Sequence, residues 1–417
     1  MKRDQLIAGL DVGSEAIRMA VARPPRTSEA ERRLNIIGVA EATSEGISKG
    51  IINSVEEAVS SISLCLERAE RMVGLPIESV WVGISGGQVI SHENKGIVAI
   101  SRADGEIQEE DIERVIEAAR LVNAPANYEI LHVIPQSFAI DHQSGIKDPL
   151  GMSGIRLEAN VQVIQGLSSQ IKNLTRCIYR TGLEIEDLVF SILATAEAVL
   201  DKRQKELGVA LIDIGKSATN GVIFEDGDVI HTFNIPIASS HITADIAIGL
   251  RSSIDTAEII KLQFGTADIK AIKKGEEIDL ATLSSIDEGV VLRKYVAEII
   301  EARVEEIFER VVKELDKIDR ASKLPAGVIF TGGGAKLGGL AELAKRKFKL
   351  PAFLGYPHHF ISAIDRVNDL SFATAVGLAL WGINAEIHPE GAMFKAKGRG
   401  LGKLGDKIKK IFKSFTP

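Results

Sequence analysis

Apolar and polar positions along the chain alternate in two ways, one typical of strands and the other of helices. Short apolar or alternating runs predict strands at residues 7–10, 17–22, 34–41, 80–84, 184–190, 219–224, 229–236 and 327–330. Apolar residues three or four positions apart predict helices at residues 55–73, 108–122, 168–180, 256–264 and 289–318. Because strands and helices alternate along most of the chain, we expect an α/β fold with mixed sheets covered by helices.

The pattern changes in one block, residues 85–164. In this block, short strands at 96–101, 129–140 and 156–164 surround a single strong helix at 108–122. Such a mixture of short strands and one helix predicts a small α+β subdomain that is inserted into the α/β framework.

One segment occurs twice. Residues 8–14 and 210–216 each carry an apolar strand into Asp-x-Gly, and a second apolar stretch follows each copy. The two aspartates, Asp11 and Asp213, lie about half the chain apart, which is too far for a local repeat. The duplicated hairpin therefore predicts two related halves that close on one polyphosphate ligand.

The turns of the two hairpins have the composition of a phosphate-binding site. Backbone N–H groups in a tight turn bind phosphate at close range, and Gly13 and Gly215 permit close approach and positive φ angles. Three hydroxyl side chains are candidates for further donors: Ser14, Ser217 and Thr219. A plain hairpin turn is the alternative for either copy taken alone.

Asp11 and Asp213 are candidates for metal contact rather than phosphate contact. Since like charges repel, neither carboxylate is expected to face a phosphate directly. We expect both to hold Mg²⁺ through water molecules, where the ion would neutralise the outer phosphates of ATP.

A third glycine-rich segment, residues 331–335, follows a predicted strand, and a helix is expected to begin near Lys336. This context favours close approach of the backbone to a nucleotide, with the helix N-terminus directed at negative charge. The candidate residues are Gly332, Gly333 and Gly334. The segment matches neither a Walker A loop nor a dinucleotide-binding fingerprint, and a tight strand–helix turn is the alternative.

Glu258 and Lys261 stand three positions apart on the predicted helix 256–264, so they share one face of it. Both side chains are candidates for hydrogen bonds to a ribose or to an adenine edge. The alternative is a solvated surface ion pair.

Composition adds a segregated charge pattern to this picture. The chain has 417 residues and a net charge of −7. Residues 395–417 hold eight basic residues and one acid, so this segment carries +7 and the remainder carries −14. An acidic body argues against general nucleic-acid binding. No apolar stretch approaches the ~20 residues that a membrane-spanning helix requires.

The basic C-terminal segment has the pattern of an interfacial amphipathic helix, with apolar residues at helical spacing and lysines on the opposite face. The candidate membrane residues are Leu401, Leu404, Lys407, Ile408, Lys410, Ile411, Phe412 and Phe415. Residues 386–400 are aperiodic and predict a flexible linker. We therefore expect residues 401–417 to bind anionic lipid, with a helix packed on the protein's own core as the alternative.

Taken together, these motifs resemble those of a known superfamily. The two hairpins, the Glu258–Lys261 pair and the glycine-rich segment are similar to the phosphate, nucleoside and adenosine motifs of the actin/Hsp70/sugar-kinase superfamily. Within it, residues 82–87, 132–136 and 145–157 resemble the FtsA family of bacterial cell division. The resemblance implies an α/β, actin-like, ribonuclease-H-like duplicated fold of two lobes, with a C-terminal amphipathic helix.

The resemblance also implies a division into domains and a function. The lobe I core would comprise residues 1–84, 165–205 and part of 365–385, the inserted subdomain 85–164, the lobe II core 206–240 and 326–364, and the helical subdomain of lobe II 241–325. FtsA proteins bind ATP with Mg²⁺, polymerise on the cytoplasmic face of the cell membrane and anchor the FtsZ ring at the division septum.

Several classes of partner are implied by the same resemblance. The C-terminal peptide of FtsZ would dock on the helical subdomain, here about residues 240–325. Further copies of the chain would form filaments, and anionic membrane lipids would bind the C-terminal helix. Other division proteins are also expected partners, whereas nucleic acid is not.

Two places depart from the family's pattern. Lys216 and Ser217 stand where the second phosphate loop usually has glycine, so a point charge replaces backbone freedom. Leu193 or Ala194 occupies the place of the Gln or Glu that orients the attacking water, and Glu197 lies one helical turn later. Weak or absent ATP hydrolysis is therefore expected.

Other members of the superfamily are alternatives. A PilM-like scaffold of type IV pilus assembly would lack the basic amphipathic tail. A sugar kinase would require a catalytic carboxylate and a sugar site, and neither is visible in the sequence. An Hsp70-like chaperone would require a β-rich peptide-binding domain after the nucleotide module. The tail and residues 145–157 favour the FtsA family.

Overall fold

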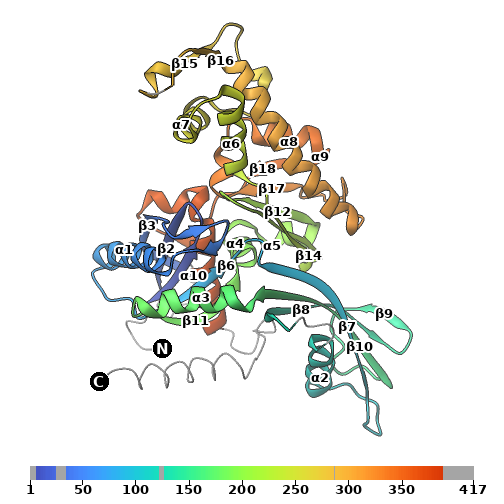
Figure 1. Cartoon of the computed structure of the whole chain (residues 1–417). Helices are drawn as coiled ribbons and strands as arrows, with labels where there is room; N and C mark the ends of the chain where they lie inside the picture. Colours follow the sequence, from blue (N-terminus) through green and yellow to red (C-terminus); the bar gives the residue numbers. More distant parts are fainter. Residues whose placement is uncertain (1–5, 25–33, 122–125, 286, 388–417) are drawn as a thin grey trace. The chain divides into compact units, whose positions relative to one another are not determined.

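The computed structural model describes residues 6–24, 34–121, 126–285 and 287–387. They form two compact units, a larger one made of residues up to 91 and 166–387 and a smaller one made of residues 92–165 (Figure 1). The predicted tail helix 401–417 and residues 388–400 of the predicted linker lie outside the described residues.

The first lobe of the larger unit is built on a six-stranded sheet in the order β11-β6-β1-β2-β3-β19. Its strands are β1 Ile7–Val12, β2 Ala16–Arg23, β3 Leu34–Thr43, β6 Ser79–Ile84, β11 Glu184–Phe190 and β19 Phe360–Ile361. β1, β2 and β3 pair antiparallel, whereas β6 and β11 extend the sheet in parallel. A short hairpin of β4 Ile47–Ser48 and β5 Ile51–Ile52 lies outside this sheet.

Helices cover both faces of this sheet. The helices of this lobe are α1 Val55–Val73, α3 Ser168–Arg180, α4 Ser191–Val199, α5 Lys202–Leu207 and α10 Ala373–Ile387. A Cβ atom on Gly38 would lie 2.5 Å from the Val73 side chain of α1, and one on Gly9 would lie 2.3 Å from the Ala375 carbonyl oxygen of α10. Because the register of β1, β2 and β3 places Gly9 and Gly38 on opposite faces, α1 and α10 enclose the sheet.

The second lobe repeats this plan. Its five-stranded sheet has the order β14-β13-β12-β17-β18, with strands β12 Val209–Ile214, β13 Thr219–Glu225, β14 Asp228–Ile235, β17 Val328–Thr331 and β18 Ala352–Leu354. The first three strands pair antiparallel and the last two in parallel, as in the first lobe. The predicted duplicated two-lobed fold is therefore confirmed.

Helices of the second lobe share a core with its sheet. They are α6 Ser239–Leu250, α7 Ile254–Phe264, α8 Arg293–Lys317 and α9 Leu340–Phe348. The apolar stripe of α8 is buried, including Val296, Ile300, Val304 and Phe308. The helix predicted from residue 289 begins later, because residues 290–292 pair with residues 277–279 as strands β16 and β15.

The smaller unit is an α+β block, as the sequence predicts. Its sheet has the order β7-β10-β8-β9, with β7 Val89–Ala99, β8 Tyr128–Ile140, β9 Gln143–Ile146 and β10 Arg156–Leu167. Helix α2, Glu109–Arg120, packs on it through the buried residues Ile112, Val115 and Ala119. The unit spans residues 92–165, against the expected 85–164, because β7 and β10 run as single strands into the larger unit.

Candidate functional site

The first Asp-x-Gly hairpin joins β1 to β2 in the first lobe. Its register places Asp11 directly opposite Arg18, whose Nε donates to Glu41 Oε2 at 2.7 Å. Gly13 does not use the positive φ that glycine permits. Glycine is required there because a Cβ would lie 2.8 Å from the Ala16 carbonyl oxygen across the turn.

The second hairpin, between β12 and β13, repeats these contacts. Gly215 also has no positive φ, and its Cβ would lie 3.1 Å from the Ala218 carbonyl oxygen. The position equivalent to Arg18 is held by a neutral side chain, since Asp213 pairs with Asn220. The two turns therefore share a backbone shape, whereas their charges differ.

Asp11 and Asp213 act on each other electrostatically. Burial raises the pKa of Asp11 to about 6, and the charge of Arg18 opposes this rise. Burial and then the negative charge of Asp11 raise the pKa of Asp213 to about 7, again against Arg18. Each lobe therefore presents a carboxylate to the same space, and a cation placed there would favour the charged form of both.

The three candidate hydroxyls differ in availability. Ser14 Oγ accepts a hydrogen bond from the Gly50 amide at 2.8 Å, which leaves its own proton for a ligand. Ser217 is partly buried in the turn between β12 and β13. Thr219 does not fit the predicted role, because it is fully buried and its hydroxyl donates to the Ile237 carbonyl at 2.7 Å.

The glycine-rich segment passes very close to the end of β12. A Cβ on Gly332 would lie 2.0 Å from Asp213 Oδ1, and one on Gly334 would lie 2.6 Å from the Ile214 side chain. Gly333 has no atom within 4 Å of its would-be Cβ, so it borders open space. The segment thus lies against the second aspartate, as a nucleotide-contacting loop would.

The helix expected near Lys336 is not there. Residues 333–336 form a single 3-10 turn, and α9 begins only at Leu340. The N-terminus of α9 therefore does not follow the glycines directly, and the predicted helix-dipole contribution at this segment is wrong.

Glu258 and Lys261 share one face of α7 and form an ion pair of 2.7 Å. Thr243 of α6 completes a triangle, since its hydroxyl donates to Glu258 at 2.6 Å and accepts from Lys261 at 2.9 Å. Burial raises the pKa of Glu258, but hydrogen bonds from Lys261 and Thr243 outweigh burial and hold this pKa below its ordinary value. Lys261 is largely buried and Glu258 is partly exposed, and Thr243 ties the pair to a second helix. No sequence motif indicated the part that Thr243 plays.

Lys216 lies between the candidate groups. Its Nζ is 2.5 Å from Glu15 Oε2 in the first hairpin. Its charge also lowers the pKa of Glu258. Lys216 therefore connects the two hairpins and the face of α7. No motif in the sequence indicated this contact of Glu15.

The segment before the second hairpin carries no free carboxylate in the expected place. Leu193 and Ala194 of α4 are buried, with 3% and 0% of their surfaces exposed. Glu197 accepts a hydrogen bond from Lys205 at 2.7 Å, so its carboxylate is held by α5. This contact agrees with the expectation that Glu197 is directed away from a nucleotide.

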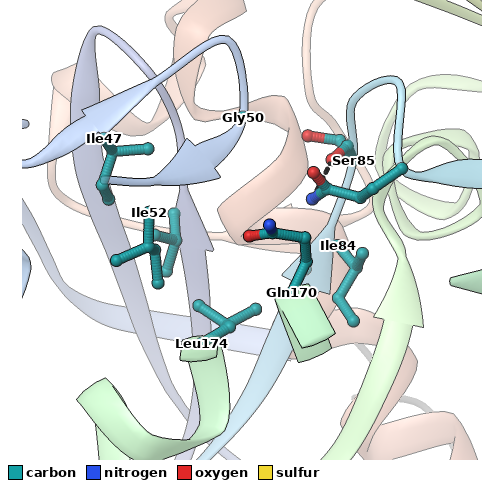
Figure 2. Close-up of a pocket in the computed structure, with 10 residues that line it drawn as sticks. Ile47, Gly50, Ile52, Ile84, Ser85, Gln170 and Leu174 are labelled. Carbon is teal, nitrogen blue, oxygen red and sulfur yellow. Dashed lines mark hydrogen bonds between the residues drawn. The ribbon is translucent and has the colours of Figure 1, made fainter. Parts of the chain in front are cut away.

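A small pocket lies behind the first hairpin, within the larger unit (Figure 2). Its polar side chains are Ser85, Gln88 and Gln170, and most of the others are apolar. The lining residues are Val12, Ile47, Gly50, Ile52, Gly83, Ile84, Ser85, Gln88, Gln170 and Leu174. None of the candidate nucleotide residues lines it, but it borders the first hairpin, because Val12 lies between Asp11 and Gly13 and the Gly50 amide donates to Ser14.

Within the described ranges, no group of three or more His, Cys, Asp or Glu side chains is arranged to hold a metal ion. Among the same residues, no helix combines the length and the apolar composition needed to cross a bilayer.

Two family models match the chain. The model described as the SHS2 domain inserted in FTSA matches residues 86–165, which agrees with the smaller unit. The model described as cell division protein FtsA matches residues 210–377, which include the second hairpin, α7 and the glycine-rich segment.

Curated relatives are similar over almost the whole chain. Cell division protein FtsA of Pseudomonas aeruginosa is 37% identical over 382 residues, which are 92% of this chain and 90% of the relative. That of Bacillus subtilis is 38% identical and covers 91% and 83%, respectively. That of Escherichia coli is 31% identical over 98% of both chains.

Solved structures share the fold at low sequence identity. The type IV pilus complex of PilM and PilN gives a TM-score of 0.67 at 16% identity, covering 91% of this chain and 99% of the other. MreB5 of Spiroplasma citri, solved with ADP, gives a TM-score of 0.54 at 14% identity, covering 93% and 99%. These likenesses support the actin-like architecture.

Proposed function

This chain belongs to the FtsA family of cell division proteins, and from that premise we propose that it is an ATP-binding filament protein that links the FtsZ ring to the membrane. The observation that carries the proposal is the pair of facing Asp-x-Gly hairpins. Their aspartates are close enough for the charge of Asp11 to raise the pKa of Asp213. A cation between the two carboxylates would stabilise their charged forms, and the Mg²⁺ that accompanies a nucleoside triphosphate supplies one.

ATP would lie between the hairpins and the face of α7. Gly13, Gly215 and the Ser14 hydroxyl would contact its phosphates, and the Glu258–Lys261 pair would contact its nucleoside. The MreB5 structures, which share this fold, are described with ADP and with AMPPNP bound.

Mg²⁺ would bind with few protein ligands. Asp11 and Asp213 would hold it, and water molecules and phosphate oxygens would complete its octahedral shell.

Partner binding is proposed for the helices of the second lobe. Large apolar side chains are exposed on α6, α7, β16 and α8: Ile248, Ile254, Leu262, Val290, Leu292 and Tyr295. Apolar surface of this kind fits docking of the C-terminal peptide of FtsZ. The family's septal role makes the division septum the place where this contact would form.

Membrane attachment is assigned to residues 401–417, whose amphipathic pattern comes from the sequence alone. One copy of such a helix binds anionic lipid reversibly, whereas a filament presents many copies and binds far more tightly. Attachment would therefore depend on polymerisation at the cytoplasmic face of the cell membrane.

Electron microscopy of the purified protein on a monolayer with anionic lipid, with and without ATP and Mg²⁺, tests the proposal. Filaments are expected on the lipid with ATP, and a variant truncated before Leu401 is expected to leave the monolayer bare. The truncated variant should still bind ATP in calorimetry, which separates a lost anchor from a misfolded protein. Equal coverage by the truncated variant would contradict the assigned anchor.

A PilM-like scaffold is the second candidate, favoured by the TM-score of 0.67. That likeness is structural, at 16% identity, whereas the FtsA relatives reach 31–38% over most of the chain. A pull-down of FtsZ that retains this protein would favour the first candidate.

A further inference from the structure

Glu15 and Lys216 form a contact between the two hairpins. Glu15 belongs to the turn after β1, and Lys216 to the turn after β12, so the ion pair of 2.5 Å connects the first lobe to the second. Both side chains are accessible, with 61% of Glu15 and 46% of Lys216 exposed. The contact is therefore open to solvent.

The backbones on both sides of this contact are fixed. Ser239 and Ser240, in the first turn of α6, donate to the carbonyl oxygens of Gly215 and Lys216 at 3.2 and 2.9 Å. On the other side, the Ser44 amide donates to the Glu15 carbonyl at 3.2 Å. The two side chains therefore project from braced loops, and they can change partner by rotamer motion alone.

The other cations near the site already have firm partners. Arg18 is held by Glu41 at 2.7 Å, and Lys261 by Glu258 and Thr243. Lys216 has only the exposed Glu15 carboxylate as its ion-pair partner among the described residues. Exposed pairs of this kind are weak and screened by salt, so a ligand with several negative charges can displace the carboxylate.

We propose that Glu15 and Lys216 form a latch over the phosphate site that the polyphosphate of ATP opens by taking Lys216 from Glu15. In the free protein the carboxylate neutralises the lysine and ties the lobes together. In the bound protein the lysine contacts the outer phosphates, and Glu15 turns to solvent. Glu15 thus lowers the affinity for any ligand that needs Lys216, and this inference rests on the proposed binding of ATP.

A double-mutant cycle measured by isothermal titration calorimetry tests the latch, with the full chain, ATP and Mg²⁺. Glu15→Gln frees Lys216, so it should tighten ATP binding by ~3- to 10-fold. Lys216→Met should weaken binding by about 10-fold or more. In the Lys216→Met background, Glu15→Gln should change the affinity by less than about 2-fold, because no lysine is left to release.

Two controls distinguish the latch from simple repulsion between Glu15 and phosphate. Repulsion would persist in the Lys216→Met background, and that result would overturn the proposal. Glu45→Gln removes one charge from the loop next to Ser44 and should leave the affinity unchanged. Adenosine, which lacks phosphates, should bind Glu15→Gln and the wild type equally.

The outcome also separates this inference from the function on which it rests. If the wild type binds ATP and Glu15→Gln binds it no more tightly, the latch alone is contradicted. If the wild type, folded by circular dichroism, gives no heat with ATP and Mg²⁺, the proposed function and the latch are both contradicted.

Discussion

Asp11 and Asp213 hold equivalent places in their sheets but have different neighbours across the hairpin. Asp11 faces Arg18, whereas Asp213 faces the neutral Asn220, which accepts a hydrogen bond from Asn234 at 2.5 Å. The second aspartate therefore lacks a cation directly opposite it. Its charged form is the less favourable of the two, as the pKa of about 7 for Asp213 and about 6 for Asp11 indicates.

The pKa of Asp213 predicts how stability depends on pH in the absence of nucleotide and metal. The folded-state pKa of about 7 exceeds the value of an unfolded Asp, ~3.9, so ionisation disfavours the folded state. The contribution of this group to stability is complete below pH ~4 and is lost as the pH rises through 7.

Asp213→Asn removes this charge and should raise the free energy of unfolding by about 1–3 kcal/mol at pH 8. Little gain is expected at pH 4, where the carboxyl is protonated in the folded protein. Urea denaturation of the metal-free protein at both pH values measures the difference. A gain of equal size at pH 4 and pH 8 would show that burial of the charge is not the cause.

Gly332 and Gly333 offer a matched pair of substitutions. Gly332 has a φ of 88°, and its Cβ would meet Asp213 Oδ1 at 2.0 Å, so Gly332→Ala should cost about 2–4 kcal/mol of stability. Gly333→Ala should cost less than about 1 kcal/mol, because nothing lies within 4 Å of its Cβ. Thermal unfolding of the two variants compares them directly, and equal losses would contradict the described packing.

At the scale of elements, the sequence predicts the bounds of long periodic segments correctly, whereas it does not predict those of short segments. Helices α1 and α3 and strand β11 have the bounds that the sequence predicts. The turn between β13 and β14 also follows from its sequence, since Asp226 and Gly227 both take the positive φ that a two-residue hairpin needs.

The misplaced elements have physical causes that no local pattern reports. Residues 290–292 look like the start of α8, yet they pair as a strand with residues 277–279, which precede them in the chain. Residues 333–336 stop as one 3-10 turn, because Gly332 and Gly334 are pressed against β12. The partners Arg18, Glu15 and Thr243 depend on strand register and helix packing, and the positions of Asp11 and Asp213 in the sequence do not reveal them.

The residues of helix α4 predict that ATP turnover is slow. Leu193 and Ala194 cannot orient a water molecule, and Glu197 is held by Lys205. Steady phosphate release should therefore stay below about 0.1 s⁻¹, low against the usual enzyme range, and Glu197→Gln should not reduce it further. A phosphate-release assay with purified protein and Mg²⁺ measures both, and a marked loss in Glu197→Gln would make this residue catalytic.

At the scale of the whole molecule, the smaller unit is attached to the larger one through two neighbouring strands. β7 and β10 pair with each other, and where the chain leaves the first lobe the Leu167 amide donates to the Gln88 carbonyl at 3.0 Å. Since the two ends of the insertion meet at this hydrogen bond, the first lobe needs only a turn there to be continuous.

Replacing residues 89–166 with a short Gly-Ser turn should leave the rest of the protein folded, with ATP affinity within about 3-fold of the wild type. The sheet β11-β6-β1-β2-β3 takes no strand from the insertion, which is why the nucleotide site should survive. Calorimetry and circular dichroism test both expectations. Loss of ATP binding in a folded variant would show that the smaller unit contributes to the site.

The two lobes share one strand order, but the contact between Glu15 and Lys216 has no charged equivalent in the repeat. Counted from the aspartates, Lys216 corresponds to Ser14, and Glu15 corresponds to Ser217. Two identical halves about a two-fold axis would present each contact twice, but here the equivalent of the charged contact is a pair of serines. The two ends of a nucleotide differ chemically. A binding site with exact two-fold symmetry would therefore bind the nucleotide equally well in two opposite orientations. Divergence between the two hairpins therefore makes the site asymmetric, so that a nucleotide binds in a single orientation.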